Sequence, residues 1–157
     1  MKIFKTRVVK TPNRGTEKSA GIDFFIPDDF AKTIIKPNES ILIPSGIKVN
    51  LPANTCLTFQ NKSGVCTKKL LVIGAKIVDE DYQGEIHIHL INVGNISQTI
   101  EPGDKIAQGI VCPVIYESIE EVATLEECFT ETTQKREAGL GSTGVKKKKK
   151  KKTYSSS

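Results

Sequence analysis

Short segments in which apolar and polar residues alternate recur along most of the chain. Apolar residues occupy every second position in two clear stretches, which are Ile47, Val49 and Leu51, and Ile86, Ile88 and Leu90. A later apolar run covers residues 110–115. Alternation with a period of two places apolar side chains on one face of a β-strand. The pattern therefore predicts strands around these positions, each with one face in a core.

Proline, glycine and asparagine separate these stretches at short intervals. The predicted turns are Pro37-Asn38, Pro44-Ser45-Gly46, Pro52-Ala53-Asn54, Ser63-Gly64, Gly74, Gly84, Gly94-Asn95 and Pro102-Gly103. Short strands with regular turns are typical of an all-β sandwich or barrel. The one candidate helix covers residues 118–128, and it is weak because Val122 and Thr124 are β-branched.

The composition changes towards the C-terminus. We predict a β-domain over residues 1–133, a glycine-rich arm over residues 134–145 and a disordered, lysine-rich tail over residues 146–157. No apolar run reaches the length of a membrane span, and the first ten residues lack the apolar block of a signal peptide. We expect a cytoplasmic protein without membrane contact, or a nuclear one if the source is eukaryotic or viral.

The net charge of +5 arises from the tail, where seven lysines occupy positions 146–152. Without them, 16 basic residues stand against 18 acidic ones, so the body carries about −2. A nucleic-acid-binding body is therefore not indicated. The lysine run itself has two interpretations: a solvated tail, or a weak nonspecific contact with nucleic acid that salt would suppress.

The cysteines and histidines do not form a recognisable metal site. Cysteines at 56, 66, 112 and 128 lack C-x-x-C spacing, and we predict buried free thiols. His87 and His89 share one face of a strand, so a metal pair and a solvated or interface-packed pair are both open, but no third ligand is at hand.

Three segments are candidates for chemistry. Residues 79–85, D-E-D-Y-Q-G-E, carry four carboxylates, which fits either a charged hairpin turn or a carboxylate that orients a water or a metal. Residues 61–64, N-K-S-G, fit either an ordinary turn or one that directs N–H groups at a phosphate. Residues 139–144 are glycine-rich, but Val145 follows where a P-loop needs lysine, so the P-loop is rejected. A mobile arm that folds over an anion stays open.

Together, these segments resemble the five motifs of the trimeric deoxyuridine triphosphatase (dUTPase) family. The matching segments are A-G-I-D-F at residues 20–24, N-K-S-G-V at 61–65, G-A-K-I-V-D-E-D-Y-Q-G at 74–84, G-D-K-I-A-Q at 103–108 and R-E-A-G-L-G-S-T-G at 136–144. Four departures stand out: Asn61 replaces proline, Lys62 arginine, Lys76 glycine and Leu140 phenylalanine. Arg136 lies one residue closer to Gly144 than in the family pattern, and Lys135 has the expected offset, so either cation could serve.

The resemblance implies a jelly-roll-like barrel that forms a homotrimer, with three subunits sharing each active site through the C-terminal arm. It also implies Mg²⁺-dependent hydrolysis of dUTP to dUMP and pyrophosphate, which keeps uracil out of DNA and supplies dUMP. Asp79 would be the catalytic residue that orients the attacking water. Asp23 would hold a Mg²⁺-bound water.

The remaining roles implied by the resemblance concern the substrate. The residues expected to contact phosphate are Lys62, Ser63, Gly64, Gln108 and Arg136. The hairpin around Lys76 and Ile77 would exclude the thymine methyl group, and Tyr82 would pack on the deoxyribose. Leu140 would cover the uracil, and Gly141 and Ser142 in the same arm would also bind the substrate.

Two alternatives remain on the same fold. The first is a dCTP deaminase-like enzyme, in which Glu85 would activate water. The second is a regulatory binding protein that has lost catalysis. The assay that separates them is release of pyrophosphate from dUTP or of ammonia from dCTP.

Overall fold

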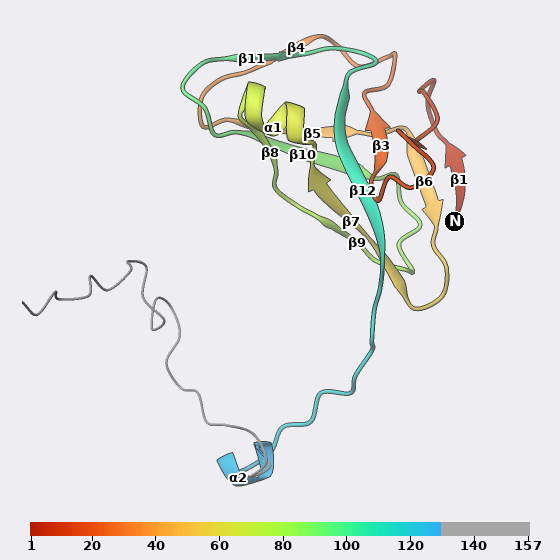
Figure 1. The fold of residues 1–157 in the computed structure, drawn as a ribbon, viewed down its shortest axis with the longest axis vertical. Helices are drawn as coiled ribbons and strands as arrows, with labels where there is room; N and C mark the ends of the chain where they lie inside the picture. Colours follow the sequence, from red (N-terminus) through yellow and green to blue (C-terminus); the bar gives the residue numbers. More distant parts are fainter. Residues whose placement is uncertain (130–157) are drawn as a thin grey trace, which may run out of the picture. The chain divides into compact units, whose positions relative to one another are not determined.

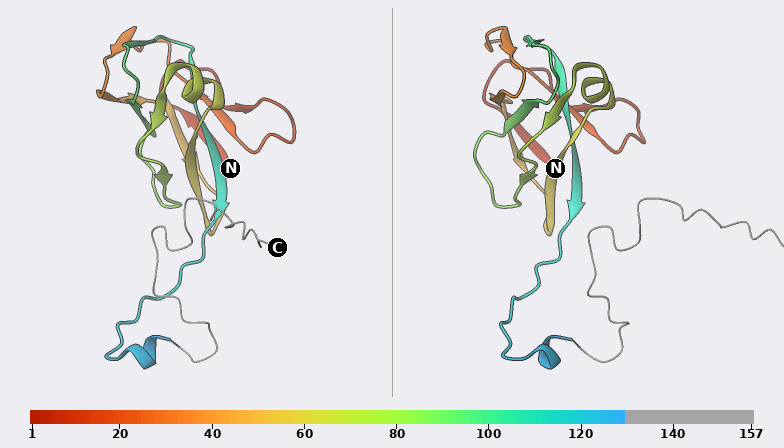
Figure 2. Two further views of the ribbon diagram at one scale, coloured as in Figure 1. Left: turned by 60° about the vertical axis from the view of Figure 1, so that its left-hand side comes forward. Right: turned by 90° about the vertical axis from the view of Figure 1, so that its left-hand side faces the viewer.

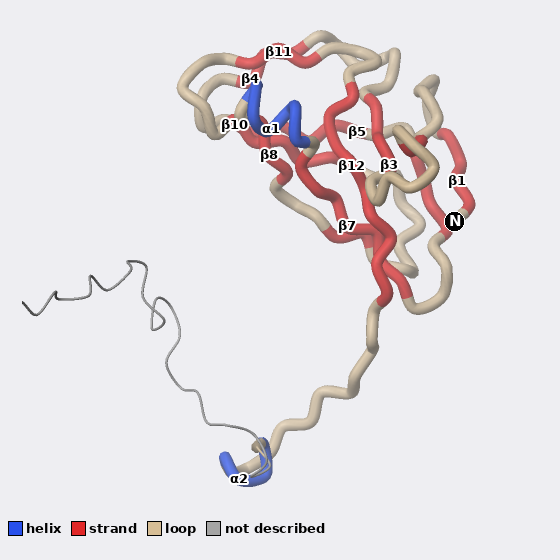
Figure 3. Tube along the Cα trace, in the orientation of Figure 1, coloured by secondary structure: helices blue, strands red, loops and turns tan. Residues whose placement is uncertain are grey.

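The computed structural model describes residues 1–129 of the 157-residue chain. The chain divides into two units, Met1–Glu117 and Ser118–Ser157. The first unit contains strands β1–β12 and helix α1, and the described part of the second contains helix α2, Leu125–Cys128 (Figures 1 and 3). The all-β prediction is confirmed, and the predicted boundary at residue 133 lies outside the described residues.

The strands of the first unit are short and form four sheets. Their bounds are β1 Lys2–Lys5, β2 Asn13–Arg14, β3 Ile22–Phe25, β4 Thr33–Ile35, β5 Ser40–Pro44, β6 Ile47–Asn50, β7 Thr55–Asn61, β8 Leu71–Ile73, β9 Ile77–Val78, β10 His87–Asn92, β11 Gln98–Ile100 and β12 Lys105–Pro113. The largest sheet has the order β2-β3-β12-β7-β9, and a second has the order β5-β10-β8. Two-stranded pairs β1-β6 and β4-β11 complete the unit. All of the strand pairs are antiparallel.

The predicted alternation places the core. In β10 every second residue is buried, and β6 alternates in the same way. Phe24 of β3 and Phe59 of β7 are fully or almost fully buried and meet edge to face, with ring centroids 4.9 Å apart. Burying each of these aromatic side chains stabilises the fold by about 1.5–3 kcal/mol, and their edge-to-face contact adds to this.

Four of the predicted turns contain the backbone conformation that their residues favour. Asn38, Gly46, Asn54 and Gly103 all have positive φ, between 57° and 81°. Asparagine and glycine adopt this left-handed region at lower cost than other residues. Strands thus end where the sequence predicts, at the turns that contain Pro-Asn, Pro-Ser-Gly, Pro-Ala-Asn and Pro-Gly.

Helix α1, Ser63–Lys69, corrects the prediction of a turn at Ser63-Gly64. Its sequence holds glycine, valine and threonine, which are poor helix formers, so local propensity gives no signal. Lys68 and Lys69 lie in its last turn, where cations are favoured, and Lys69 Nζ donates to the carbonyl of Thr99 at 3.2 Å. Contacts with the rest of the domain therefore stabilise this helix.

The helix predicted over residues 118–128 is present only as the four-residue helix α2. Thr124 caps it by accepting a hydrogen bond from the N–H of Glu127 at 3.3 Å. Neither helix in residues 1–129 is long and apolar enough to span a membrane.

The four cysteines are free, as predicted, but they are not buried. Cys56, Cys66 and Cys112 are half-buried and Cys128 is exposed. Cys56 and Cys112 lie opposite each other on β7 and β12 and share the outer face of the largest sheet. The prediction of burial fails because this face of the sheet is not covered within one copy of the chain.

Candidate active site

Asp23 stands at the centre of a cluster that three distant segments build. It lies on β3 directly opposite Gln108 of β12, and its side chain is only 7% exposed. Lys62, at the junction of β7 and α1, approaches from one side, and Lys105, at the start of β12, approaches from the other. The strand register therefore brings the first, second and fourth motifs together.

Both oxygens of the Asp23 carboxylate are paired with a cation. Lys62 Nζ lies 2.5 Å from Oδ1, and Lys105 Nζ lies 3.1 Å from Oδ2. Burial by itself would raise the pKa of Asp23, but the hydrogen bonds from the two lysines outweigh burial and lower it. The cluster of one anion and two cations carries a net positive charge, which suits a polyanionic ligand.

The Gln108 side chain is fixed beside the same cluster by a hydrogen bond to the backbone. Its Nε2 donates to the carbonyl of Asn61 at 2.7 Å, beside Lys62. Gly21 allows this arrangement, because a Cβ at that position would lie 2.8 Å from Gln108 Cδ. The glycine of the first motif thus leaves room for the glutamine of the fourth.

Ser63 and Gly64 form the first turn of α1, with Lys62 as the N-cap residue. The first helical hydrogen bond runs from the N–H of Cys66 to the carbonyl of Lys62, at 2.8 Å. The N–H groups of Ser63 and Gly64 precede this bond and have no acceptor within the helix. The predicted site residues Lys62, Ser63, Gly64 and Gln108 therefore lie together around Asp23.

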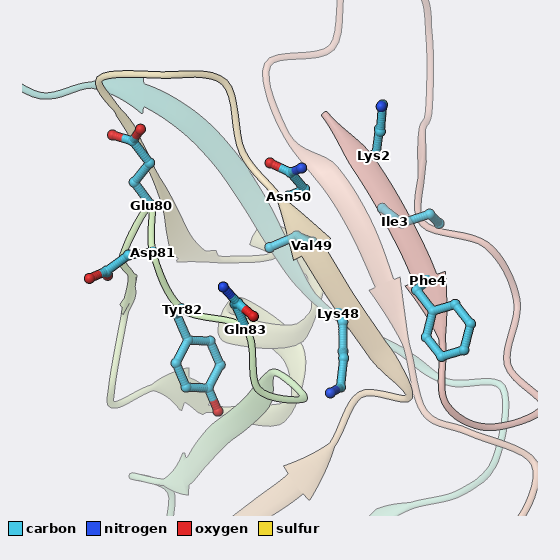
Figure 4. A pocket seen from close by; sticks show the side chains of 10 residues that line it. All are labelled: Lys2, Ile3, Phe4, Lys48, Val49, Asn50, Glu80, Asp81, Tyr82 and Gln83. Atoms are coloured by element: carbon cyan, nitrogen blue, oxygen red, sulfur yellow. The ribbon is translucent and has the colours of Figure 1, made fainter.

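Asp79 lies elsewhere, directly after β9, with an exposed side chain. It lines a hollow with Asn50, Leu51, Glu80, Asp81 and Tyr116. The loop that follows is closed by two hydrogen bonds, from Tyr82 N–H to the Asp79 carbonyl at 3.2 Å and from the Tyr82 hydroxyl to the Glu85 carbonyl at 2.9 Å. Figure 4 shows this loop facing β6 and β1 across a second hollow, with Tyr82 and Gln83 on one side and Phe4 on the other.

The Asp23 cluster and Asp79 lie at opposite ends of β7. Leu57 pairs with Val78, which places Asp79 level with Cys56, six residues before Lys62. At the rise of an antiparallel strand these six residues span about 20 Å. In Figures 1 and 2, α1 lies at one end of the strands and the end of β12 at the other, and the start of β7 pairs with that end. One copy of the chain therefore does not bring Asp79 to the cluster.

The hairpin residues Lys76 and Ile77 connect the two sheets. The carbonyl of Lys76 accepts a hydrogen bond from the N–H of Phe59 at 2.7 Å, so the segment is fixed to β7. The Ile77 side chain is 68% exposed. Ile77 pairs with Thr58, two residues along β7 from the level of Asp79, and Lys76 is level with Phe59, midway between the levels of Asp79 and Lys62.

Several predicted site residues lie outside the described residues. They are Arg136 with its alternative Lys135, Leu140, Gly141 and Ser142. The lysines at positions 146–152 also lie outside this range.

Lys105 is the site residue that our sequence analysis missed. It occupies the arginine position of the fourth motif, and this correspondence was the signal that could have identified it. Arg14 is a second addition, because its Nη1 donates to the carbonyls of Ser19 and Ala20 at 2.5 and 2.7 Å. It thereby holds the loop that leads into Asp23.

Glu85 is held in a structural ion pair. Its Oε1 accepts from Arg7 Nε at 2.9 Å and from the Gly46 N–H at 2.8 Å, and its side chain is 18% exposed. Burial would raise the pKa of Glu85, but the hydrogen bonds from Arg7 and Gly46 lower it below its ordinary value. Glu85 thus fastens its loop to the segments that carry Arg7 and Gly46.

The surroundings of Asp23 are better suited to a metal ion that binds together with a polyanionic ligand than to a metal ion bound by the protein alone. Among residues 1–129 no three His, Cys, Asp or Glu side chains gather as a metal cage. Asp23 already has two ammonium partners, but an ionised carboxylate offers about four lone-pair sites, so it can still accept a hydrogen bond from a metal-bound water. Mg²⁺, which keeps several waters and prefers oxygen ligands, fits this arrangement.

Replacing Asp23 by asparagine is expected to weaken the dependence of stability on pH in the acid range. In the unfolded chain the pKa of Asp23 is about 3.9, and in the folded chain the hydrogen bonds from Lys62 and Lys105 hold it below that value. Its ionised form therefore adds stability above that value, and this stability is lost as the pH falls through the folded pKa. Urea unfolding between about pH 7 and pH 3 should show a smaller loss of unfolding free energy for the variant.

A suitable control is Asp28→Asn, because Asp28 is exposed and no salt bridge among residues 1–129 includes it. This control should keep the wild-type pH dependence. Glu85 and Arg7 are unchanged in both variants, so their own contribution cancels in the comparison. Equal pH dependence in Asp23→Asn and wild type would contradict the assignment of the ion pairs.

Comparison with known proteins agrees with this geometry. Residues 7–144 match the family model described as dUTPase. A deoxyuridine 5'-triphosphate nucleotidohydrolase of Clostridium novyi is 39% identical over 136 residues, which cover 85% of this chain and 90% of that protein. The family match thus spans all five motif segments.

Solved structures share the fold. A mutant of the Staphylococcus bacteriophage 80alpha dUTPase with dUpNHpp superposes with a TM-score of 0.81 at 22% identity, covering 92% of this chain and 98% of that one. A mutant of the dUTPase from phage phi11 of S. aureus, solved with a structural Mg(II) ion, gives a TM-score of 0.70 at 22% identity, covering 80% and 97%. With the family model matched over most of its length and the motif residues clustered as described, this chain belongs to the dUTPase family.

Proposed function

We propose that this chain hydrolyses dUTP to dUMP and pyrophosphate, as a homotrimer whose active sites are shared between subunits. The observation that carries the proposal is the cationic cluster of Lys62 and Lys105 around buried Asp23, which three motifs assemble on a dUTPase fold. Such a reaction removes dUTP from the nucleotide pool and supplies dUMP.

The Asp23 cluster is suited to the triphosphate. Lys62 and Lys105 offer two ammonium groups, and Gln108 and Ser63 add uncharged donors nearby. The negative charge on the phosphate oxygens changes as a phosphoryl bond breaks, and fixed donors that meet this charge lower the barrier. Lys62 replaces the family arginine, so it acts as a point charge rather than as a bidentate fork.

Asp79 is suited to the attacking water. It is exposed at the rim of a hollow and its backbone is fixed by the Tyr82 N–H, so the carboxylate is accessible and its position is defined. Asp79 accepts a hydrogen bond from the water and orients it toward the α-phosphorus, and it takes up the proton as the P–O bond forms. The bond from the α-phosphorus to the bridging oxygen then breaks, and pyrophosphate leaves.

The separation of about 20 Å along β7 supports a shared site. A triphosphate is far shorter than this, so Asp79 and the Asp23 cluster act on one substrate only if they come from different copies. The second unit also exposes Ile119, Leu125 and Phe129, apolar side chains that are suited to the surface of another protein chain. A closed three-fold ring gives every copy the same pair of contacts.

Mg²⁺ is the metal that we propose for the site, and Asp23 is the residue that would hold it, through a bound water. When bound, Mg²⁺ neutralises part of the triphosphate charge. Without the metal, Lys62 and Lys105 would be the main counter-charges on the phosphates. The structural Mg(II) ion of the phi11 enzyme is consistent with this choice but belongs to that protein.

Base and sugar selectivity would come from the segment that leads into Asp79 and from Tyr82, which follows it. A backbone hairpin at Lys76 and Ile77 can exclude the methyl group of thymine by steric overlap. Cytosine presents an amino donor where uracil presents an acceptor, and the mismatch costs about 1–3 kcal/mol. Tyr82, whose hydroxyl is fixed to Glu85, can pack on the deoxyribose and exclude a 2′-hydroxyl.

The structure favours this reaction over deamination of dCTP. The deaminase hypothesis gives Glu85 the task of activating water, but Glu85 is bound to Arg7 and Gly46 at 2.9 and 2.8 Å. Asp79, in contrast, forms no salt bridge within residues 1–129. Of these two carboxylates, Asp79 is therefore the one without an ion-pair partner among the described residues.

The proposal is tested by measuring pyrophosphate release from dUTP, dTTP, dCTP and UTP with Mg²⁺. We expect kcat/KM for dUTP to exceed that for each of the others by at least about 10²-fold, because the site combines steric and hydrogen-bond selection. Ammonia release from dCTP would favour the deaminase. Absence of pyrophosphate release from dUTP, with the nucleotide still bound, would favour the non-catalytic binding protein.

A further inference from the structure

The segment of residues 74–78, here called the base-binding segment, is fixed to a neighbouring strand through His89 of β10. The N–H of Gly74 donates to the His89 carbonyl at 2.9 Å, and the N–H of Ala75 donates to His89 Nδ1 at 3.2 Å. At its other end, Val78 pairs with Leu57 of β7. The segment thus spans two sheets, and His89 makes both contacts at its beginning.

Gly74 and the His89 ring are in close contact. A Cβ at Gly74 would overlap the imidazole, with Cε1 at 2.6 Å and Cγ at 2.9 Å. Only a residue without a side chain allows the ring to lie flat enough against the backbone for Nδ1 to reach the next N–H. The glycine and the histidine therefore form one unit.

The hydrogen bond from Ala75 selects the tautomer of His89. A backbone N–H can only donate, so Nδ1 must be the unprotonated nitrogen and the neutral ring carries its proton on Nε2. The other histidine, His87, is exposed, and its Nδ1 lies 3.0 Å from the Glu85 carbonyl. The two histidines thus have different environments on one strand.

We propose that His89 is a positioning residue for nucleobase selection, which it performs as an Nδ1 acceptor that fixes the base-binding segment. The inference rests on the proposed dUTP hydrolysis, and it adds a residue that does not itself touch the substrate. A shift of the Ala75 N–H changes the backbone that meets the uracil edge, whereas Asp79 lies beyond the Val78–Leu57 pair. Loss of the contact therefore affects substrate binding and base discrimination more than the chemical step.

The test compares His89→Ala and His89→Asn with wild type in pyrophosphate release. Asparagine places an amide oxygen close to the position of Nδ1, so it keeps an acceptor, and alanine removes it. For His89→Ala we expect KM for dUTP to rise about two- to tenfold, the range for one net hydrogen bond, and the preference for dUTP over dCTP to fall by a similar factor. We expect kcat to stay within about twofold, and His89→Asn to recover most of the loss in KM.

Gly74→Ala approaches the same contact from the other side. The Cβ of the alanine would displace the His89 ring, so KM for dUTP should rise as in His89→Ala. In the double variant Gly74→Ala/His89→Ala the overlapping ring is gone, so its KM should be no higher than that of either single variant. His87→Ala is the matched control on the same strand and should leave KM unchanged. If the effects of His89→Ala and Gly74→Ala on KM add independently, the proposed unit does not exist.

A ring ¹⁵N NMR spectrum of the wild-type protein gives a readout that needs no variant of His89. The chain has two histidines, so His87→Ala assigns both rings. We expect the His89 shifts of an unprotonated Nδ1 and a protonated Nε2, and a protonated Nδ1 would overturn the proposal. An unchanged KM and base preference in folded His89→Ala would also overturn it, and absence of dUTP hydrolysis in wild type would instead reject the proposed function.

Discussion

Replacing Asp79 by asparagine is expected to lower kcat for dUTP by about 10²- to 10⁴-fold, the contribution that general base catalysis typically makes. Asparagine is nearly isosteric and keeps one oxygen, but it cannot take up the proton of the attacking water. Asp79 is exposed and lies at the end of β9, outside the buried core, so the domain should fold normally. Pre-steady-state turnover and equilibrium binding of dUTP measure the two effects separately, and we expect Kd to change little.

The matched control for this variant is Asp81→Asn, which removes the same charge from the same exposed loop. A general electrostatic effect of the acidic loop would lower kcat equally in both variants. We expect a far smaller loss for Asp81→Asn, because exposed charges are screened by solvent and salt. Near-normal turnover of Asp79→Asn would remove Asp79 from the role of base.

Mixing two inactive variants is expected to restore activity. Asp79→Asn lacks the base, and Lys62→Met lacks a cation of the Asp23 cluster, at the opposite end of β7. If each site takes Asp79 from one copy and Lys62 from another, random reassembly of equal amounts leaves about a quarter of the sites with both intact residues. Activity should then rise from the level of the single variants to about a quarter of wild type, measured after joint unfolding and refolding.

The double variant Asp79→Asn/Lys62→Met, mixed with wild type in equal amounts, provides the control. About a quarter of the sites should again be intact, because each needs two undamaged neighbours. If both residues acted within one copy, half of the sites would survive in this control, and the two single variants would not complement each other. That result would reject the shared site while leaving dUTP hydrolysis itself untouched.

Much of the fold was predictable because local signals and tertiary packing agree. Alternation at Ile47 and Val49 places the buried face of β6, and the Pro-led turns place left-handed backbone at Asn38 and Asn54. In such segments the hydrophobic pattern and the turn chemistry require the same structure. The motif residues Lys62 and Gln108 were likewise predictable as members of one site.

The parts that could not be predicted depend on contacts between distant segments. Helix α1 has no propensity signal, and only its packing and the anchor of Lys69 on Thr99 stabilise it. The pairing of Asp23 with Lys105 depends on the register of β3 and β12, which includes a shift between Lys105 and Ala107. A bulge of this kind redirects side chains and leaves no trace in a pattern of period two.

Asp23 also supplies the two lysines of the cluster with a counter-ion from the chain itself. Lys62 and Lys105 are paired with a carboxylate, so in the proposed reaction a phosphate would exchange one anion for another instead of removing water from two fully solvated ammonium groups. When pyrophosphate departs, the reverse exchange would follow, because the two lysines would form their ion pairs with Asp23 again. Product release from this end of the pocket then becomes a competition between two anions for the same pair of cations.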